Sequence, residues 1–327
     1  MRGFCASLTM VLLASGLGGS FDSVRAQTYP NRNITLVVPF PPGGSTSIVG
    51  RVVADKMSQL LGQSIVVDNR GGAGGTVGTK AVAKSEPDGY TLLAGYTGTL
   101  AIGPSLYRNA GYDPRKDFEP IGSIGCSPSS LVVHPSFPAR TVAELIAYAK
   151  ANPGKVNFGS AGVGTVGHIT GEYFAHATGI HLVHIPYKGT GPALSDLLGG
   201  HIPMSFSPIA TTAGNVRAGL LRGLAVTSST RSALLPNVPS AAEAGLKDFD
   251  VRTWAGLLAP KGTPPDIIAQ LNKAVQMSLA DPAIKAKLEA AIGGEVRGST
   301  PAEMHDLVAS EIVKWRALIE TAKIPKI

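Results

Sequence analysis

Residues 34–69 read ITLVVPFPPGGSTSIVGRVVADKMSQLLGQSIVVDN and contain two β-branched apolar runs, separated by a glycine-rich turn and an amphipathic stretch. The runs 34–40 and 64–69 have the composition of buried strands, and residues 46–62 carry apolar side chains at helical spacing. A helix-like stretch and a third strand-like run follow at 75–89 and 90–95. Alternation of this kind predicts a parallel sheet with helices on both faces.

A second series of alternating runs occupies the middle of the chain. Its strand-like runs are 155–161, 182–187, 202–207 and 220–228, and its helix-like stretches are 141–154, 167–179, 191–200 and 211–219. Two further stretches with helical spacing, 264–281 and 301–322, form the tail. We therefore expect an α/β fold of two packed units, between which the chain crosses near residues 121–133 and 248–258.

The first 26 residues have the features of a secretory signal peptide. Arg2 precedes an apolar run that is shorter than a membrane span, and Val24-Arg25-Ala26 resembles a small-residue cleavage site. Cleavage after Ala26 leaves 327 − 26 = 301 residues, in which Cys126 is the single cysteine. An exported chain without a disulfide predicts a location in a bacterial periplasm.

The chain is basic, with a formal net charge of +7, but its cations are dispersed. Between residues 145 and 242 the acids are Glu172 and Asp196, against six lysines and arginines. The absence of a Lys/Arg run or a basic stripe with aromatic residues argues against nucleic-acid binding. A diffuse positive field instead favours small anions.

Two glycine-rich loops follow predicted strands, at residues 39–47 and 157–168. In open parallel sheets ligands bind beyond the carboxyl ends of the strands, where backbone N–H groups of the next helix point outward. Amides and hydroxyls in these loops could hold a carboxylate without a lysine or arginine. The alternative is that both loops are ordinary turns.

Several other motifs were weighed as sites for a cofactor, a metal or catalysis. Residues 162–167 match G-x-G-x-x-G, but no acid follows at the ribose-binding distance, so we expect no dinucleotide cofactor. Alternating strand geometry places His181 and His184 on opposite faces, which argues against a metal site. The chain lacks a G-x-S-x-G elbow, so an exported serine hydrolase that pairs Ser160 with His168 is a lesser alternative. Lys188, at a strand end, is a binding residue or simply a solvated lysine.

Nine stretches together resemble one known family. They are VVPFPPGGSTS, NRGGAGG, EPDGYTLL, YDPRKDFEPI, GSAGVGTVGH, IPYKGTGPALSDLLGG, RAGLLRGLAVTS, LPNVPSAAEAG and WAGLLAPKGTP. Over nearly all of its length after the signal peptide, the chain resembles the Bug-type periplasmic binding proteins of tripartite tricarboxylate transporters. The resemblance implies a type II periplasmic-binding-protein fold, with residues 27–126 and 249–327 in one lobe and 127–248 in the other.

The resemblance also implies a small carboxylate ligand, no catalysis, and membrane components of a transporter as partners. The implied binding residues are Phe40, Gly43, Gly44, Ser45, Thr46, Ser47, Thr97 and Gly98 in the first lobe and Ser160, Ala161, Gly164, Thr165, His168, Tyr187, Ser205 and Phe206 in the second. Tyr187 and Phe206 are expected as apolar walls or as core. We expect a monomer without cofactors, and a sensor kinase is the alternative partner.

Two positions depart from the pattern that the resemblance implies. Ser47 and Pro203 stand where family members usually have aspartate. We expect both changes to remove negative charge near the cleft, where an acid could bind an ammonium group. The hypothesis is therefore a ligand without an amine, either an aliphatic dicarboxylate or an aromatic carboxylate.

Overall fold

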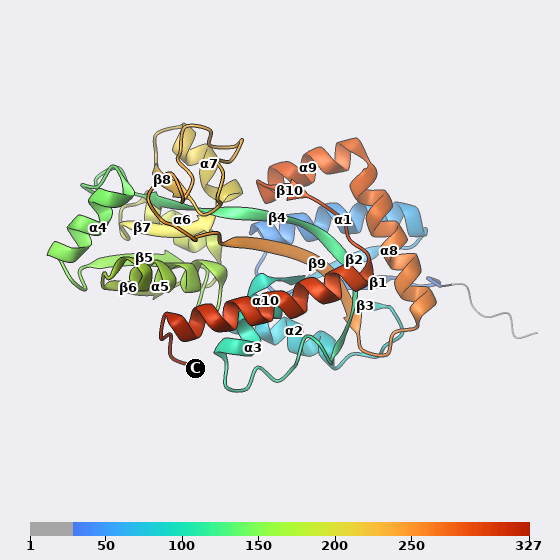
Figure 1. The fold of residues 1–327 in the computed structure, drawn as a ribbon. Coiled ribbons are helices and arrows are strands. Elements are labelled where there is room, and N and C mark those ends of the chain that lie inside the picture. Colours follow the sequence, from blue (N-terminus) through green and yellow to red (C-terminus); the bar gives the residue numbers. More distant parts are fainter. Residues whose placement is uncertain (1–28) are drawn as a thin grey trace, which may run out of the picture.

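The computed structural model describes residues 29–327, so the predicted signal peptide lies outside the described residues. The described chain forms two α/β lobes side by side (Figure 1), which confirms the predicted fold class. The strands are β1 (Ile34–Val38), β2 (Ile65–Asn69), β3 (Thr91–Tyr96), β4 (Phe118–Val133), β5 (Val156–Ser160), β6 (Leu182–Pro186), β7 (Met204–Pro208), β8 (Arg222–Val226), β9 (Arg252–Pro260) and β10 (Glu295–Val296). The helices are α1 (Ser45–Leu61), α2 (Thr76–Ala83), α3 (Gly103–Leu106), α4 (Val142–Ala151), α5 (Val166–Thr178), α6 (Thr190–Leu198), α7 (Ile209–Arg217), α8 (Pro265–Ala280), α9 (Pro282–Ile292) and α10 (Pro301–Thr321), with short helical turns η1 (Ala73–Gly75) and η2 (Gly98–Ile102).

The long strand β4 belongs to both lobes. From Phe118 to Pro128 it pairs antiparallel with β9, and from Ser129 to Val133 it pairs with β7 and β8. The strand order is β2-β1-β3-β9-β4-β7-β5-β6, with β8 and β10 also paired to β4. We call β1, β2, β3, β9, β10 and their helices the first lobe, and β5 to β8 with theirs the second. Strands β4 and β9 run through the segments where the crossings are predicted (Figure 1).

Parallel pairing places the loops that follow the strands of each lobe at one edge of its sheet. In the first lobe β1 pairs parallel with β2 and β3, and in the second β5 pairs parallel with β6 and β7. The loops that leave the carboxyl ends of such strands gather at the same edge. The loops after β1, β5 and β6, and the point where β7 passes into α7, are therefore brought to the junction of the lobes.

Helix α10 ties the two lobes together. It packs against η2, α3 and β4, and its far end reaches α5 of the second lobe (Figure 1). It begins with the capping box of Thr300 and Glu303, which satisfies the first backbone N–H groups. Its buried face consists of Met304, Val308, Ile312, Trp315 and Ile319, at three- and four-residue spacing. These side chains join one hydrophobic cluster that continues into the second lobe.

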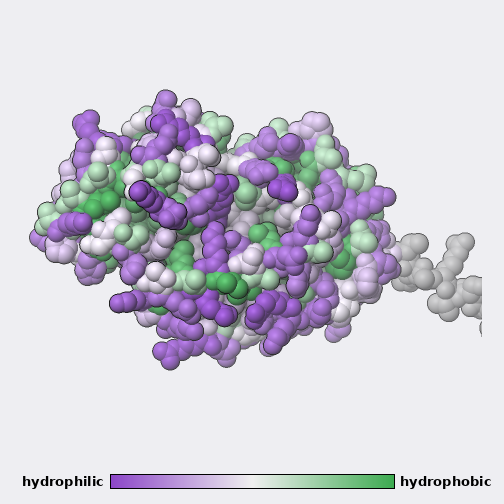
Figure 2. Space-filling view, viewed as in Figure 1, coloured by the Kyte–Doolittle hydropathy of each residue, from purple (hydrophilic) through white to green (hydrophobic). Residues whose placement is uncertain are grey.

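The outer surface carries mainly polar side chains. The face in Figure 2 is mostly hydrophilic, and its hydrophobic residues form small separate groups. Large exposed apolar side chains, such as Val66 and Val313, lie on different elements. Within residues 29–327, no helix has both the length and the apolar character to cross a bilayer.

Candidate functional site

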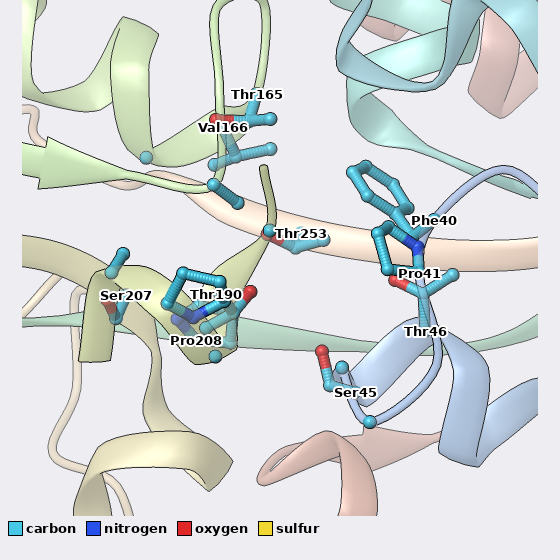
Figure 3. A pocket seen from close by; sticks show the side chains of 18 of the residues that line it. Phe40, Pro41, Ser45, Thr46, Thr165, Val166, Thr190, Ser207, Pro208 and Thr253 are labelled. Carbon is cyan, nitrogen blue, oxygen red and sulfur yellow. The ribbon is translucent and has the colours of Figure 1, made fainter. Parts of the chain in front are cut away.

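A cavity of about 320 Å³ lies where the loops of the two lobes meet (Figure 3). The first lobe contributes the loop after β1 and Tyr96. The second lobe contributes the loops after β5 and β6 and the last residues of β7, and β4 and β9 contribute one residue each. The lining residues are Phe40, Pro41, Pro42, Gly43, Gly44, Ser45, Thr46, Tyr96, Ser129, Ala161, Thr165, Val166, Gly167, Lys188, Gly189, Thr190, Gly191, Pro192, Ala193, Phe206, Ser207, Pro208 and Thr253. Figure 3 shows Ser45, Thr46 and Phe40 on one side of the cavity and Thr190, Ser207 and Pro208 on the other.

The loop after β1 is shaped by proline, glycine and a neighbouring asparagine. Prolines after Val38 provide no N–H for a further strand ladder, and Gly43 adopts a φ of 90°, which favours glycine. The Nδ2 group of Asn69, at the end of β2, donates to the carbonyl of Phe40 at 2.7 Å and to Ser47 Oγ at 3.1 Å. Asn69 therefore holds the loop at both of its ends.

The loop after β5 is held by hydrogen bonds within itself. Ser160 Oγ donates to the carbonyl of Gly162 at 3.1 Å and accepts from the N–H of Gly162 at 3.1 Å. Thr165 Oγ1 donates to the same carbonyl at 2.7 Å. These bonds fix the loop that leads into the first turn of α5, where Thr165, Val166 and Gly167 line the cavity.

Helices α1, α5, α6 and α7 all begin at the cavity. Their N-caps are Gly44, Thr165, Gly189 and Pro208, and none of these side chains caps the helix by a hydrogen bond. The first N–H groups of a helix lack intrahelical partners, and the N-terminus carries partial positive charge. Converging helix N-termini of this kind form a site for anions.

The charges of the cavity lining have one sign. None of the lining residues described is an aspartate or a glutamate, and Lys188 is the one charged residue among them. Hydroxyl groups are frequent in the lining, on Ser45, Thr46, Ser129, Thr165, Thr190, Ser207, Tyr96 and Thr253. The cavity can therefore supply many hydrogen bonds to an anion but has no carboxylate to bind an ammonium group.

Part of the wall is apolar and rigid. The rings of Phe40 and Tyr96 meet edge to face with centroids 4.7 Å apart, and Tyr96 Oη donates to the carbonyl of Gly74 at 2.7 Å. Phe206, which is 2% exposed, lies in the second lobe with several prolines nearby in the lining. A ligand with a hydrocarbon or aromatic middle can pack against these surfaces.

Half of the predicted binding residues lie in the cavity wall. These are Phe40, Gly43, Gly44, Ser45, Thr46, Ala161, Thr165 and Phe206. The others, which are Ser47, Thr97, Gly98, Ser160, Gly164, His168, Tyr187 and Ser205, do not line it.

The residues outside the wall bond to other parts of the protein. Thr97 Oγ1 accepts from the N–H of Trp254 at 2.8 Å, which joins β3 to the crossing strand β9. Ser205 Oγ donates to the carbonyl of Gly159 at 2.9 Å, and Tyr187 Oη donates to Asp196 Oδ2 at 2.7 Å. These side chains position the strands and loops that form the wall.

Several lining residues were not predicted. Ser129 and Thr253 come from β4 and β9, whose pairing is not visible in the sequence. The loop 188–193 was not included as a whole, although it too follows a strand and opens a helix. The same signal that identified the loops after β1 and β5 could have identified it.

One of the two departures from the family pattern lies away from the cavity. Pro203 precedes β7 at its amino end, whereas Phe206, Ser207 and Pro208 line the cavity from the middle and the carboxyl end of that strand. The expectation that Pro203 lies near the cleft is therefore wrong. Ser47, in the first turn of α1, is 1% exposed and bonded to Asn69 just behind the wall.

The serine and histidine pair predicted for a hydrolase does not form. Ser160 Oγ lies 2.6 Å from Nε2 of His184, whereas His168 Nδ1 accepts from the N–H of Gly164 at 3.3 Å. The two imidazole rings stack with centroids 4.1 Å apart. Burial lowers the pKa of His168 to about 3, with a smaller contribution from His184, and burial lowers the pKa of His184 to about 4. Both rings are therefore neutral at physiological pH, and Ser160 is 2% exposed.

A larger and more open hollow, of about 590 Å³, lies on β4 beside Cys126. The arginines in its lining are already paired, Arg252 with Asp250 at 2.9 Å and Arg231 with Glu243 at 2.8 Å. Burial raises the pKa of the Cys126 thiol, so it is protonated at neutral pH. Within residues 29–327, no group of three or more His, Cys, Asp or Glu side chains could hold a metal ion.

Comparison with known proteins gives consistent matches over most of the chain. Residues 49–324 match the family described as tripartite tricarboxylate transporter family receptor. Protein BugT of Bordetella pertussis is 40% identical over 318 residues, which cover 96% of this chain and 97% of BugT. The family match and this identity over nearly the whole chain establish a common fold and ancestry.

Two solved structures are also similar. The periplasmic binding protein BugD has a TM-score of 0.86 and 38% identity, with 91% of this chain and 100% of BugD covered. Rpa4515 of R. palustris, solved with adipate, has a TM-score of 0.87 and 37% identity, with the same coverage. The two lobes, the cleft between them and these matches together identify the chain as a member of the tripartite tricarboxylate transporter family of receptors, with the fold of the Bug-type periplasmic binding proteins.

Proposed function

We propose that this protein is an exported periplasmic receptor that binds a small carboxylate without an amine and presents it to the membrane components of a tripartite tricarboxylate transporter. The observation that carries the proposal is the convergence of the uncapped N-termini of α1, α5, α6 and α7 on a cavity without acidic residues. Rpa4515, with its bound adipate, supports the carboxylate class.

The composition of the wall argues against an amino-acid ligand. An ammonium group that is buried without a partner is strongly unfavourable, and the described lining contains no carboxylate to compensate for it. Ser47 and Asn69, close behind the wall, are both neutral. Dicarboxylates and aromatic carboxylates lack the ammonium group, and their hydrocarbon parts suit Phe40 and Phe206.

Binding rather than catalysis accounts for the chemistry of the site. His184, which bonds to the buried Ser160, lies outside the wall. The described lining holds no histidine, aspartate or glutamate that could act as a general base for its serine and threonine hydroxyls. Of the binding residues predicted from the sequence, we propose that those lining the cavity touch the ligand. Thr97, Ser160, His168 and Ser205 hold them in place.

Closure of two lobes is the proposed capture step. We assign residues 27–126 and 249–327 to one rigid body and residues 127–248 to the other, with β4 and β9 as the connections. Because each body contributes helix N-termini to the cavity, an anion gains its full set of hydrogen bonds only when the bodies meet. Ligand binding therefore stabilises the closed form.

The first experiment measures ligand class. The chain from residue 27 is unfolded and refolded to remove any ligand carried through purification, and its melting temperature is then recorded with adipate, terephthalate, aspartate and glutamate. A ligand that binds only the folded state raises the melting temperature with concentration. Adipate or terephthalate should raise it, and a rise with the two amino acids alone would overturn the proposal.

The second experiment tests the role of the backbone amides. Ser45 is the first residue of α1, where proline is compatible with a helix, and Gly44 has the extended ψ of 160° that a following proline requires. Ser45→Pro removes the N–H and the hydroxyl, whereas Ser45→Ala removes the hydroxyl alone. Hydrogen bonds to charged groups contribute about 1.5–3 kcal/mol, so Ser45→Pro should weaken the binding of the active carboxylate at least about tenfold more than Ser45→Ala. Equal affinities of the two variants would show that the amide does not bind the ligand.

A further inference from the structure

Lys188 occupies an unusual position among the charged residues of this protein. It lies between β6 and α6, directly before the N-cap Gly189, and it is the charged residue of the cavity lining. Its side chain is exposed and forms no hydrogen bond or ion pair within residues 29–327. Lys56, by comparison, is paired with Asp281 at 2.7 Å.

The acid nearest to Lys188 along the chain is already engaged by another residue. Asp196, on α6, accepts a hydrogen bond from Tyr187 Oη at 2.7 Å and lies 3.5 Å from the Nδ1 atom of His201. The hydrogen bond from Tyr187 lowers the pKa of Asp196, so this acid is ionised at neutral pH, and its bonding partners are Tyr187 and His201. Lys188 therefore remains without a carboxylate partner at the edge of a cavity suited to anions.

The loop that carries Lys188 faces the loop after β1 across the cavity. The position of a β-carbon on Gly189 would be 3.9 Å from Pro41 Cγ, so the two loops nearly touch. Figure 3 shows Thr190 on the opposite side of the cavity from Ser45 and Thr46. Pro41 and Phe40 lie above Thr46 in this view. The cavity thus has one anion-binding end at the N-terminus of α1 and another at Lys188 and the N-terminus of α6, with apolar surface between them.

We propose that Lys188 is a specificity-determining residue that binds the second carboxylate of a dianionic ligand while the amides of α1 bind the first. This inference rests on the proposed function, because it assigns a role within the same carboxylate site. It goes beyond that function by naming the residue that separates dicarboxylates from monocarboxylates. A monocarboxylate would leave the ammonium group without a partner when the lobes close and exclude water, which disfavours its binding.

The test compares two ligands of equal length. Adipate and hexanoate both have six carbons, but hexanoate has one carboxylate. Their affinities are measured by titration calorimetry for the wild-type chain and for Lys188→Met, which keeps an unbranched side chain up to the ε position and removes the ammonium group. We expect Lys188→Met to weaken adipate binding about tenfold, equivalent to about 1.4 kcal/mol, and to leave hexanoate binding unchanged or slightly stronger.

The matched control is Lys155→Met. Lys155 is also exposed and also lies in the second lobe, but it precedes β5 at the amino end of the strand, on the edge of the sheet opposite the cavity. Lys155→Met removes the same unit of positive charge as Lys188→Met, so this variant reports any general loss of electrostatic attraction. The ratio of adipate to hexanoate affinity should stay at the wild-type value in Lys155→Met and in Lys188→Arg, and should fall only in Lys188→Met. Melting temperatures of all variants verify that they fold.

The outcomes separate the two proposals. If the wild-type chain prefers adipate and Lys188→Met keeps the full preference, the role of Lys188 is refuted while the carboxylate receptor stands. If Lys155→Met loses as much affinity as Lys188→Met, the effect is one of net charge and the assignment is likewise refuted. If the wild-type chain binds no carboxylate at all, the proposed function fails and the role of Lys188 fails with it.

Discussion

Tyr107 joins the two lobes at one side of the cavity, and removing its hydroxyl should weaken ligand binding. Its Oη atom lies 3.1 Å from the carbonyl oxygen of Ala73 in the first lobe and 3.1 Å from that of Val163 in the second. Gly74 and Gly164 allow this close approach, because a β-carbon on either would collide with the opposite lobe. Closure of the lobes therefore gives Tyr107 a second acceptor.

The magnitude follows from the geometry of a single hydroxyl group. One O–H donates to one carbonyl at a time, and when the lobes separate Ala73 can still accept from it. The closed form thus gains less than a full hydrogen bond, about 0.5–1 kcal/mol. If binding is coupled to closure, Tyr107→Phe should raise the Kd of adipate roughly two- to fivefold.

Titration calorimetry with adipate measures this change, and Tyr112→Phe is the matched control. Tyr112 Oη donates to the carbonyl of Thr99 at 2.7 Å, and both residues belong to the first lobe. Its removal should lower the melting temperature without changing the Kd. Wild-type affinity in Tyr107→Phe, or an equal loss of affinity in both variants, would refute the role of Tyr107 in closure.

Three further predictions concern closure, pH and a spectroscopic signal. Gly74→Ala should weaken adipate binding more than Tyr107→Phe does. The control is Gly62→Ala. Gly62 has a φ of 71°, similar to the 62° of Gly74, but no atom lies within 4 Å of the carbon that alanine would add. This variant should destabilise the fold by about 1 kcal/mol and leave the Kd unchanged in calorimetry. The pKa of His168 is about 3 in the folded protein and about 6.5 in the unfolded chain. As the pH drops from 6.5 to 5, only the unfolded state binds a proton at this residue, so the free energy of unfolding should fall by about 2 kcal/mol. Urea unfolding at pH 5 and pH 7 should show a smaller difference in His168→Asn, and an unchanged difference would contradict the assignment. In Trp315→Phe the single tryptophan of the chain is Trp254, next to Thr253 in the cavity wall. The fluorescence of Trp254 should change on addition of adipate, and constant emission at saturating adipate would contradict motion at β9.

Local patterns in the sequence were sufficient to predict the class of fold and the loops that border the cavity between the lobes. Alternating apolar runs and helical spacing are properties of neighbouring residues, and they identified the two α/β units. The glycine-rich loops after β1 and β5 were identified because βα loops in parallel sheets meet at one edge. Phe40, Ser45, Thr46 and Thr165 line the cavity for this reason.

The tertiary structure alone decided which side chains form the wall and which stand behind it. Thr253 and Ser129 reach the cavity because β4 pairs with β9 up to Pro128 and with β7 from Ser129 on, and β4 and β9 are more than a hundred positions apart in the chain. Ser160 meets His184 because the parallel pairing of β5 and β6 places His184 opposite Phe158, two positions before Ser160 and on the same face of the sheet. His168, on α5, packs its ring against that of His184 instead of reaching Ser160. Spacing along the chain determines which face of an element a side chain occupies, but only the packing of distant elements determines what that face touches.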